Sequence, residues 1–483
     1  MSATASARPH RTLFTCLVLV TALSALDQTI VATALPAITA ELGAPWRASW
    51  IVTAYALAMT ATLTTAGALG DRFGRRRTLL ACIALFVLAS LGCAASSSTE
   101  VLAAARFAQG VGGAGLLVLP QAVVADAVPA RERAAYLGPL GAVFALATVA
   151  GPLLGGWLTD LVGWRLIFAV NLPLGAAVAL LALRAVPADH RSADTDRPHR
   201  FDTAGAALIA LAASALVLVT TAAGEGAPSG AVTAGAAASA VAVVVALLWE
   251  RRPAQPVLPV RVLADRLPLL CCLLALVAGL GLFGMIAYVP MWTQGAYGTS
   301  ATGAGLMLLP TTAGITLGMN LSGRLVARHG KWRVFPRIGS ALAALAAAGL
   351  ALDTGLPLPL AALLLTLLGL GAGLFMQVVV VVAQDAGPAH SVGAVTSALA
   401  FVREIGVTVG AAGFGALAAH GLTATDTTTA TAYADTFRPV FLAAAGCFLV
   451  GLLLALALPA HRLDAEPPGA SVGVETSSGG QRD

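Results

Sequence analysis

The chain has 483 residues, of which 58% are hydrophobic and only 11% are charged. Soluble globular proteins carry about 25% charged residues, and a chain this apolar cannot keep a wettable exterior, so lipid must solvate most of it. The net charge of +5 comes without any run of Lys and Arg interleaved with aromatic residues, which argues against nucleic acid as a partner.

The apolar segments predict membrane-spanning helices. A helix needs about 20 apolar residues to cross the hydrocarbon core, and the sequence contains fourteen such segments, which two charged stretches divide into six, two and six. We therefore expect an all-α integral membrane protein. Its parts would be an N-terminus (1–11), a six-helix bundle (12–185), a linker (186–202), two accessory helices (203–249), a second linker (250–266), a second six-helix bundle (267–460) and a disordered tail (461–483).

The placement of the basic residues predicts the orientation. Of the 28 Lys and Arg residues, 23 fall on the side of the predicted spans that carries both chain ends, and three (Arg47, Arg165 and Arg438) fall on the other side. The remaining two, Arg106 and Arg403, lie within spans. Because basic residues concentrate in cytoplasmic segments, we expect a multi-pass protein of the inner (plasma) membrane with both termini in the cytoplasm.

A repeated segment indicates that the two six-helix sets are copies. The first copy runs from Gly67 to Arg77 after the second span, and the second runs from Gly323 to Arg333 after the tenth. Both copies place Gly, Leu, Arg, Gly, a basic residue and Arg at the same offsets. The second and tenth spans correspond only if the two central helices are an insertion between six-helix halves.

The first copy carries an acidic residue that suggests a conformational gate. We assign this gate to Gly67, Asp71, Arg72, Gly74 and Arg75, where the glycines allow a tight turn between closely packed helices. Asp71 can accept hydrogen bonds from the N-terminus of a neighbouring helix and pair with an arginine, which would latch one conformation. The alternative is that the basic residues only follow the positive-inside rule. Ala327 replaces the acid in the second copy, so we expect a latch on one side only.

Ionisable residues within spans are costly and therefore mark candidate sites. Asp27 lies about 24 Å up the first helix from Arg11, at 1.5 Å per residue. Arg106 lies about five residues into the fourth span, which enters from the opposite side. These depths are comparable, so the two can pair if the first and fourth helices are neighbours. We hypothesise that binding of substrate or a proton breaks this pair and thereby couples the two; the alternative is a static structural pair.

A second charged site lies near mid-depth of the thirteenth span, at Arg403 and Glu404. Neighbouring residues in a helix point about 100° apart, so these two need not pair with each other. We assign Glu404 to proton coupling together with Asp27 and Arg106, as a second protonatable or cation-attracting site. The alternative is a salt bridge to a residue of the other half.

Other residues within spans predict close packing and a cavity. Gly151, Pro152, Gly155 and Gly156 would weaken a helix in water, but in lipid they permit close packing and a bend; packing alone is the alternative to a functional role. A cavity wall that is apolar and small suits amphipathic compounds. The residues that we expect to give it polar groups are Gln28, Thr29, Gln109, Asn171, Asn320, Gln377 and Arg403.

Four elements in sequence order resemble one family. They are Leu26–Val31 with Ala34-Leu35-Pro36, the loop Gly67–Arg77, the stretch Gly151–Gly156, and Trp164-Arg165 followed by Asn171-Leu172-Pro173. Through these motifs the chain resembles the major facilitator superfamily, in its fourteen-span drug:proton antiporter branch, over residues 12–460. The resemblance implies two six-helix bundles with two accessory helices, and the stretch in the fifth span is similar to the antiporter motif that distinguishes exporters from importers. Glu404 departs from the branch, which often carries a neutral amide there.

The sequence contains no GxxxxGK[ST] fingerprint for a nucleotide, so transport would be secondary. Its cysteines and histidines form no ligand spacing, and we expect no metal or other cofactor. We predict a transporter, not an enzyme, that exports small amphipathic or hydrophobic compounds (drugs, antibiotics) in exchange for protons by alternating access. Its partners would be the small-molecule substrate, protons and membrane lipids, and we expect a monomer. The alternatives are a dedicated exporter of an endogenous metabolite and, less favoured, a membrane receptor or a membrane-embedded enzyme.

Overall fold

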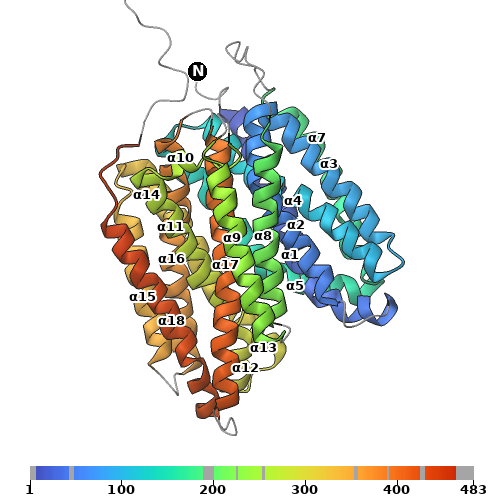
Figure 1. Cartoon of the computed structure of the whole chain (residues 1–483), viewed down its shortest axis with the longest axis vertical. Coiled ribbons are helices and arrows are strands. Elements are labelled where there is room, and N and C mark those ends of the chain that lie inside the picture. The colour runs from blue at the N-terminus through green and yellow to red at the C-terminus, as the bar shows by residue number, and fades with distance from the viewer. Residues whose placement is uncertain are drawn as a thin grey trace, which may run out of the picture.

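The computed structural model describes residues 7–42, 48–188, 201–224, 227–252, 256–352, 357–388, 391–424 and 430–463. Within these ranges the regular secondary structure is helical, without β-strands (Figure 1). The first helix begins and the last helix ends at the same end of the molecule, which we call the termini face; the opposite end is the far face. Much of the first predicted linker and of the tail lies outside the described residues.

The first six spans form the N-half. Its helices are α1 (Ala7–Leu42), α2 (Ala48–Phe73), α3 (Arg75–Ala94), α4 (Thr99–Ala127), α5 (Ala130–Val162), and the pair α6 (Arg165–Ala169) and α7 (Asn171–Ala185), which together make the sixth span. Ser98 caps α4, because its side chain accepts a hydrogen bond from the backbone N–H of Val101. At the start of α3, Gly74 has a φ of 96° that a side chain would strain.

The last six spans form the C-half. Its helices are α11 (Arg266–Ala278) with the π-helical turn η2 (Gly279–Gly284) and α12 (Val289–Tyr297), α13 (Ala301–Leu306) with α14 (Leu308–His329), α15 (Val334–Ala351), α16 (Leu358–Ala386), α17 (Val392–Ala424) and α18 (Ala430–Leu456). Gly330 follows α14 with a φ of 69°. Gly330 stands at the offset of Gly74 in the predicted repeat, so both copies turn on a glycine in the left-handed region.

The described helices agree with the fourteen predicted spans. Thirteen are long and apolar enough to cross a membrane, and α5 adds another as two segments, Ala130–Ala147 and Ala150–Val162, which meet at 45°. Pro152 lies just after this bend. A proline ring clashes with the carbonyl four residues earlier, which is residue 148, so the proline accounts for the bend.

The accessory helices α8 (Thr203–Gly224) and α9 (Ser229–Trp249) form a hairpin along the seam between the halves. Helix α8 packs against α2 of the N-half and against α17 of the C-half, and Figure 1 shows the green hairpin in front of both. In α9 only Ser239 and Ala246 are buried. The rest of α9 therefore offers its apolar side chains to lipid.

A buried carboxyl lies at the base of this hairpin, where α9 is followed by Glu250 and the short helix α10 (Val260–Leu263). Glu250 is 1% exposed. Its Oε2 accepts a hydrogen bond of 3.0 Å from the Leu258 N–H, whereas its Oε1 has no partner among the described residues. The Asp202 carboxylate lies close by, since a Cβ on Gly205 would stand 2.1 Å from Glu250 Oε1 and 2.3 Å from Asp202 Oδ2.

Burial raises the pKa of Glu250 to about 7; backbone N–H groups oppose the rise, and the charge of Asp202 adds to it. The native carboxyl therefore binds its proton more tightly than the unfolded one, whose pKa is 4.5. The native state holds more protons through this window, so stability falls as pH rises from about 4.5 to about 7. We predict that the melting temperature in detergent drops by a few degrees between pH 5 and pH 8, and that Glu250→Gln removes this drop.

The matched control for this prediction is Asp160→Asn, which neutralises an exposed acid near the far-face end of α5. It should keep the pH dependence of the wild-type chain. An equal loss of stability between pH 5 and pH 8 in Glu250→Gln and in the wild type would contradict the assignment.

Candidate functional site

A charged pair lies inside the N-half, where α1 faces α4. Arg106 Nη1 donates to Asp27 Oδ2 at 2.5 Å, and the exposed fractions of the two side chains are 1% and 0%. An isolated buried ion costs several kcal/mol in lost hydration, so each of these charges depends on the other. The depths counted along the sequence placed the two residues at one level, and the structure brings them into contact. Their role in coupling stays a prediction.

Neighbouring polar side chains satisfy the remaining oxygen of Asp27. Gln109 Nε2 and Asn171 Nδ2 donate to Asp27 Oδ1 at 2.9 and 2.7 Å. Both amides also donate to Ser90 Oγ, at 2.7 and 3.3 Å, and Arg106 Nη1 donates to Gln109 Oε1 at 2.7 Å. We call these five residues the Asp27 network. It draws on α1, α3, α4 and α7, so a change at one carboxylate reaches four helices.

Aromatic rings close over the guanidinium from other helices. The ring centroid of Tyr55 in α2 lies 4.1 Å from Arg106 Cζ, and that of Phe168 in α6 lies 5.7 Å away. Arg106 Nε donates to the Ile51 carbonyl at 3.4 Å. These contacts keep water from Arg106. A proton on Asp27 would remove the counter-charge of this guanidinium, which would favour a different arrangement of the helices around it.

The glycines predicted to matter in α5 pack on α1, one turn beyond Asp27. A Cβ on Gly151 would lie 1.9 Å from Thr29 Oγ1, and a Cβ on Gly155 would lie 2.3 Å from the Ile30 carbonyl, whereas Gly156 has no atom within 4 Å. Thr29 Oγ1 donates to the Ala147 carbonyl at 2.8 Å, at the bend of α5. Gly151 and Gly155 therefore permit a close contact between α1 and α5, and Gly156 contributes none.

Asp71 joins the halves near the termini face. Its two carboxylate oxygens accept hydrogen bonds from the backbone N–H groups of Gly393 and Ala394, at 3.0 and 2.7 Å, at the start of α17. It also forms an ion pair with Arg75, whose Nε donates to Asp126 Oδ2 at 2.9 Å. The positive end of the α17 dipole and the arginine both favour the carboxylate. These are the kinds of partner predicted for Asp71, and its role as a latch stays a prediction.

The other predicted gate residues lie around this contact. A Cβ on Gly67 would stand 2.3 Å from Ser397 Oγ, so the glycine allows α2 to approach α17. Arg72 is exposed and lies over the ring of Phe73 in its own half, with 5.4 Å between Arg72 Cζ and the ring centroid. The structure therefore places Gly67, Asp71 and Arg75 at the junction of the halves, Gly74 at the turn between α2 and α3, and Arg72 beside the junction.

The second copy of the repeat also crosses between the halves, which corrects the expectation of a latch on one side only. Arg131, at the start of α5, donates through Nε to the Ala327 carbonyl at 3.1 Å and through Nη2 to the Arg328 carbonyl at 3.0 Å. A Cβ on Gly323 would lie 2.3 Å from the Ala134 carbonyl. Here a cation binds the negative end of α14, so no acid is needed at residue 327. The sequence reasoning missed Arg131 because it treated the residue as one of many basic loop residues.

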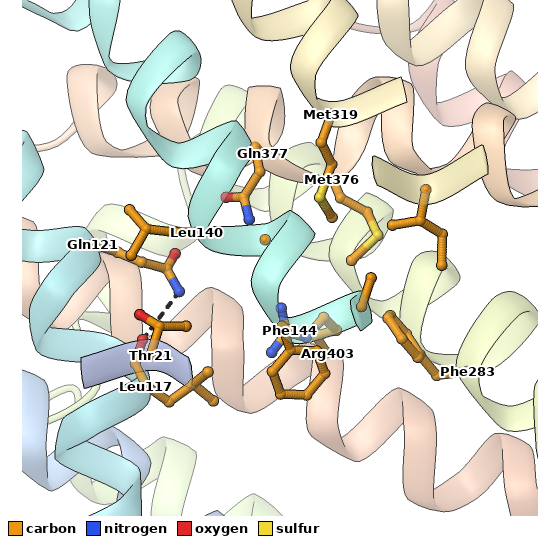
Figure 2. A pocket seen from close by; sticks show the side chains of 13 residues that line it. Thr21, Leu117, Gln121, Leu140, Phe144, Phe283, Met319, Met376, Gln377 and Arg403 are labelled. Carbon is orange, nitrogen blue, oxygen red and sulfur yellow. Dashed lines mark hydrogen bonds between the residues drawn. The ribbon is translucent and has the colours of Figure 1, made fainter. Parts of the chain in front are cut away.

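A narrow cavity lies between the halves. Thr21, Leu117, Gln121 and Phe144 line it from the N-half, and Phe283, Met319, Met376, Gln377 and Arg403 line it from the C-half (Figure 2). The rings of Phe144 and Phe283 meet edge to face across the halves, 6.3 Å between centroids. The wall thus combines two phenylalanines and two methionines with aliphatic side chains, and its polar groups are two amides, one hydroxyl and one guanidinium.

Two of the seven polar residues predicted for a cavity, Gln377 and Arg403, line this one. Gln109 and Asn171 instead bind Asp27, and Thr29 joins α1 to α5. The amide of Gln28 donates to the sulfur of Met59 at 2.8 Å, and that of Asn320 donates to the Thr316 carbonyl at 2.8 Å. The other five predicted residues therefore form hydrogen bonds inside the bundles and do not line this cavity.

Most residues of the cavity wall were not predicted from the sequence. Gln121 carried a usable signal, since it is an amide within a span, whereas the phenylalanines and methionines did not differ from lipid-facing residues. The depth of a residue can be counted along a helix, but its rotation toward a partner depends on tertiary packing.

Arg403 and Glu404 form a pair with each other, a possibility that the sequence left open. Arg403 Nη2 donates to Glu404 Oε1 at 3.1 Å, with 15% and 21% of the side chains exposed. Both side chains are long enough to span the angle between neighbouring positions. The alternative of a salt bridge from Glu404 to the other half is not found among the described residues; the contact to that half is made by the Arg403 Cζ, 5.7 Å from the ring centroid of Phe144.

The family of the chain follows from comparison with known proteins. The model of the Major Facilitator Superfamily matches residues 17–411. An uncharacterized MFS-type transporter of Mycobacterium tuberculosis is 37% identical over 84% of this chain, which spans only 59% of that relative's length. The multidrug transporter protein MdtP of Bacillus subtilis is 30% identical, over 84% of this chain and 74% of MdtP.

A solved structure shows the same architecture. The human organic anion transporter MFSD10 superposes with a TM-score of 0.66 over 92% of this chain and 99% of its own, at 19% sequence identity. At that identity the likeness concerns the fold. With a family match over most of its length and relatives within that family that are described as transporters, the chain belongs to the major facilitator superfamily.

Proposed function

We propose that this protein exports small amphipathic or hydrophobic compounds in exchange for protons. The observation that carries the proposal is the Asp27 network, which holds a carboxylate and a guanidinium inside a membrane-spanning bundle at 2.5 Å. Ionisable groups at such depth are costly, and in transporters they serve proton relays and substrate paths. Within the described spans, Asp27 is the acidic residue that is fully buried.

The contacts at the termini face support an alternating-access mechanism. We place the protein in the inner (plasma) membrane with this face in the cytoplasm, because the face carries most of the basic residues. Asp71 and Arg131 would then close the cytoplasmic side in this conformation. A transport cycle would break both contacts and rock the halves about the cavity between them.

The proton gradient is a sufficient source of energy for this exchange. One proton moving down 100 mV supplies about 2.3 kcal/mol, and each pH unit adds about 1.4 kcal/mol. One proton for each substrate could therefore sustain about a few hundred-fold gradient of a neutral compound.

The central experiment removes the acid of the network. We expect Asp27→Asn in liposomes to lower the proton flux evoked by amphipathic substrates at least tenfold, because the proton loses its binding site. The single variant leaves Arg106 without a counter-charge, at a cost of about 3–5 kcal/mol. The double variant Asp27→Asn/Arg106→Gln avoids this and should show the same loss. Glu132→Gln, an exposed acid at the start of α5, is the matched control. Wild-type flux in the folded double variant would refute the proposal.

The pH profile of transport tests whether Glu404 takes part in proton coupling in addition to Asp27. If Glu404 exchanges protons, Glu404→Gln should retain substrate binding while the dependence of transport on pH flattens or shifts. The profile is measured as uptake into inverted vesicles between pH 5.5 and pH 8.5. A variant that transports with an unchanged profile would show that Glu404 takes no part in coupling.

The latch can be tested through backbone protection. Asp71→Ala removes the acceptor for the Gly393 and Ala394 N–H groups, so we expect hydrogen exchange of these amides to accelerate at least tenfold and the termini face to open more often. Glu132→Ala, on the same face, should leave their exchange unchanged. Equal protection in Asp71→Ala and the wild type would mean that the contact does not hold the halves together.

A further inference from the structure

The charge in the cavity between the halves is of one sign. A second cavity, lined by Ala278, Leu399 and Thr396 among others, shares Gln121, Met376 and Arg403 with the first, so the two are adjacent. Among the described residues that line these two cavities, Arg403 is the charged one, and none carries a carboxylate. A ligand in this space therefore contacts a guanidinium and no carboxylate.

Glu404 leaves most of the Arg403 donors unused. The ion pair takes up one N–H, through Nη2 at 3.1 Å, whereas a guanidinium carries five donors in a planar fork. The other donors have no hydrogen-bond acceptor among the described residues. Glu404 lies on the stripe of α17 that faces α2, two turns beyond Ser397, which donates to the Thr64 carbonyl at 3.4 Å. The guanidinium thus reaches the cavity while its carboxylate partner stays to one side.

A second polar group in the same wall is unpaired. Gln377 is 5% exposed, and its Oε1 has no partner among the described residues. Figure 2 shows Gln377 on the opposite side of the cavity from Arg403. A buried amide oxygen without a hydrogen-bond donor destabilises the protein. A ligand that donates a hydrogen bond to Gln377 Oε1 would remove this cost.

The remaining wall suits an apolar body. Phe144 and Phe283 present ring edges and faces, and Met319 and Met376 add thioethers that adapt to irregular shapes. Figure 2 shows these side chains surrounding the space beside Arg403. A planar anion matches the guanidinium fork in two parallel hydrogen bonds, which a cation or a neutral amide cannot reproduce.

We propose that the preferred substrates are amphipathic anions, whose carboxylate binds Arg403 while an aromatic or aliphatic body packs against Phe144, Phe283 and the methionines. This proposal rests on the proposed export function and assigns its substrate class. A hydroxyl or N–H at the far end of the substrate would donate to Gln377 Oε1. Arg403 is the specificity-determining residue.

The first test needs only the wild-type chain and three probes with one body. These are 2-naphthylacetate, 2-naphthylacetamide and 2-(2-naphthyl)ethylammonium, which are anionic, neutral and cationic. Their affinities for the purified full chain are measured in detergent by thermal stabilisation and equilibrium dialysis. We expect the carboxylate to bind at least about tenfold more tightly than the amide, as one charge-assisted contact provides, and the ammonium to bind most weakly. Tighter binding of the ammonium or equal binding of all three would overturn the proposal.

The second test assigns the preference to Arg403. Arg403→Gln/Glu404→Gln removes both charges together and should abolish the preference for the carboxylate over the amide. Glu404→Gln alone frees the guanidinium and should strengthen it, and Arg403→Lys should retain part of it. Arg324→Gln, an exposed arginine of α14, is the matched control and should bind as the wild type does. A preference that survives in the double variant would overturn the role of Arg403.

Transport separates this inference from the function on which it rests. In liposomes under an imposed pH gradient, proton flux evoked by the amide and the ammonium but not by the carboxylate would refute the anionic class and leave proton-coupled export intact. Selective binding of the carboxylate without proton flux from any probe would support the Arg403 site and refute proton-coupled export. We expect the carboxylate to evoke the largest flux.

Discussion

The ion pair between Asp27 and Arg106 is the interaction on which the arrangement of the N-half depends. Two charges at that depth are tolerated only with full hydrogen bonding. The structure supplies these hydrogen bonds from Gln109 on α4 itself and from Ser90 and Asn171 on two further helices, α3 and α7. The same demand fixes the register of α1 against α4 and α7. The close α1–α5 contact through Gly151 and Gly155 follows one turn beyond, so the bend of α5 and the charged pair belong to one packing unit.

Both copies of the repeat form a contact between the halves, but the charged side chain is acidic in one contact and basic in the other. On one side the acid of α2 binds the N–H groups that begin α17, and on the other the Arg131 guanidinium of α5 binds the carbonyls that end α14. Each contact uses the end of a helix dipole with the complementary side chain. Both lie toward the termini face, while the cavity lies deeper between the halves. A rearrangement around Asp27 would reach them through α1, which contacts both α2 and α5.

The sequence predicted the features that depend on the length of an apolar segment, on the depth of a residue along its helix and on the chemistry of its side chain. The fourteen spans followed from apolar length, and the contact between Asp27 and Arg106 followed from counting residues to a common depth. The partner type of Asp71 followed from the chemistry of a carboxylate near a helix start. The cavity wall could not be predicted in this way, because Phe144, Phe283 and Met319 differ from lipid-facing residues only in the rotation of their helices. The pairing of Arg403 with Glu404 depended on side-chain conformation.

The central claim is that protonation within the Asp27 network changes the contact between the halves. The direct measurement is the distance between spin labels on the termini face, at Arg184→Cys of the N-half and Arg324→Cys of the C-half, in a chain whose native cysteines are replaced by alanine. The account predicts that lowering the pH from 8 to 5.5 lengthens this distance in a measurable fraction of molecules, and that Asp27→Asn gives one distribution at both pH values. The same pH-dependent shift in Asp27→Asn as in the parent chain would contradict it.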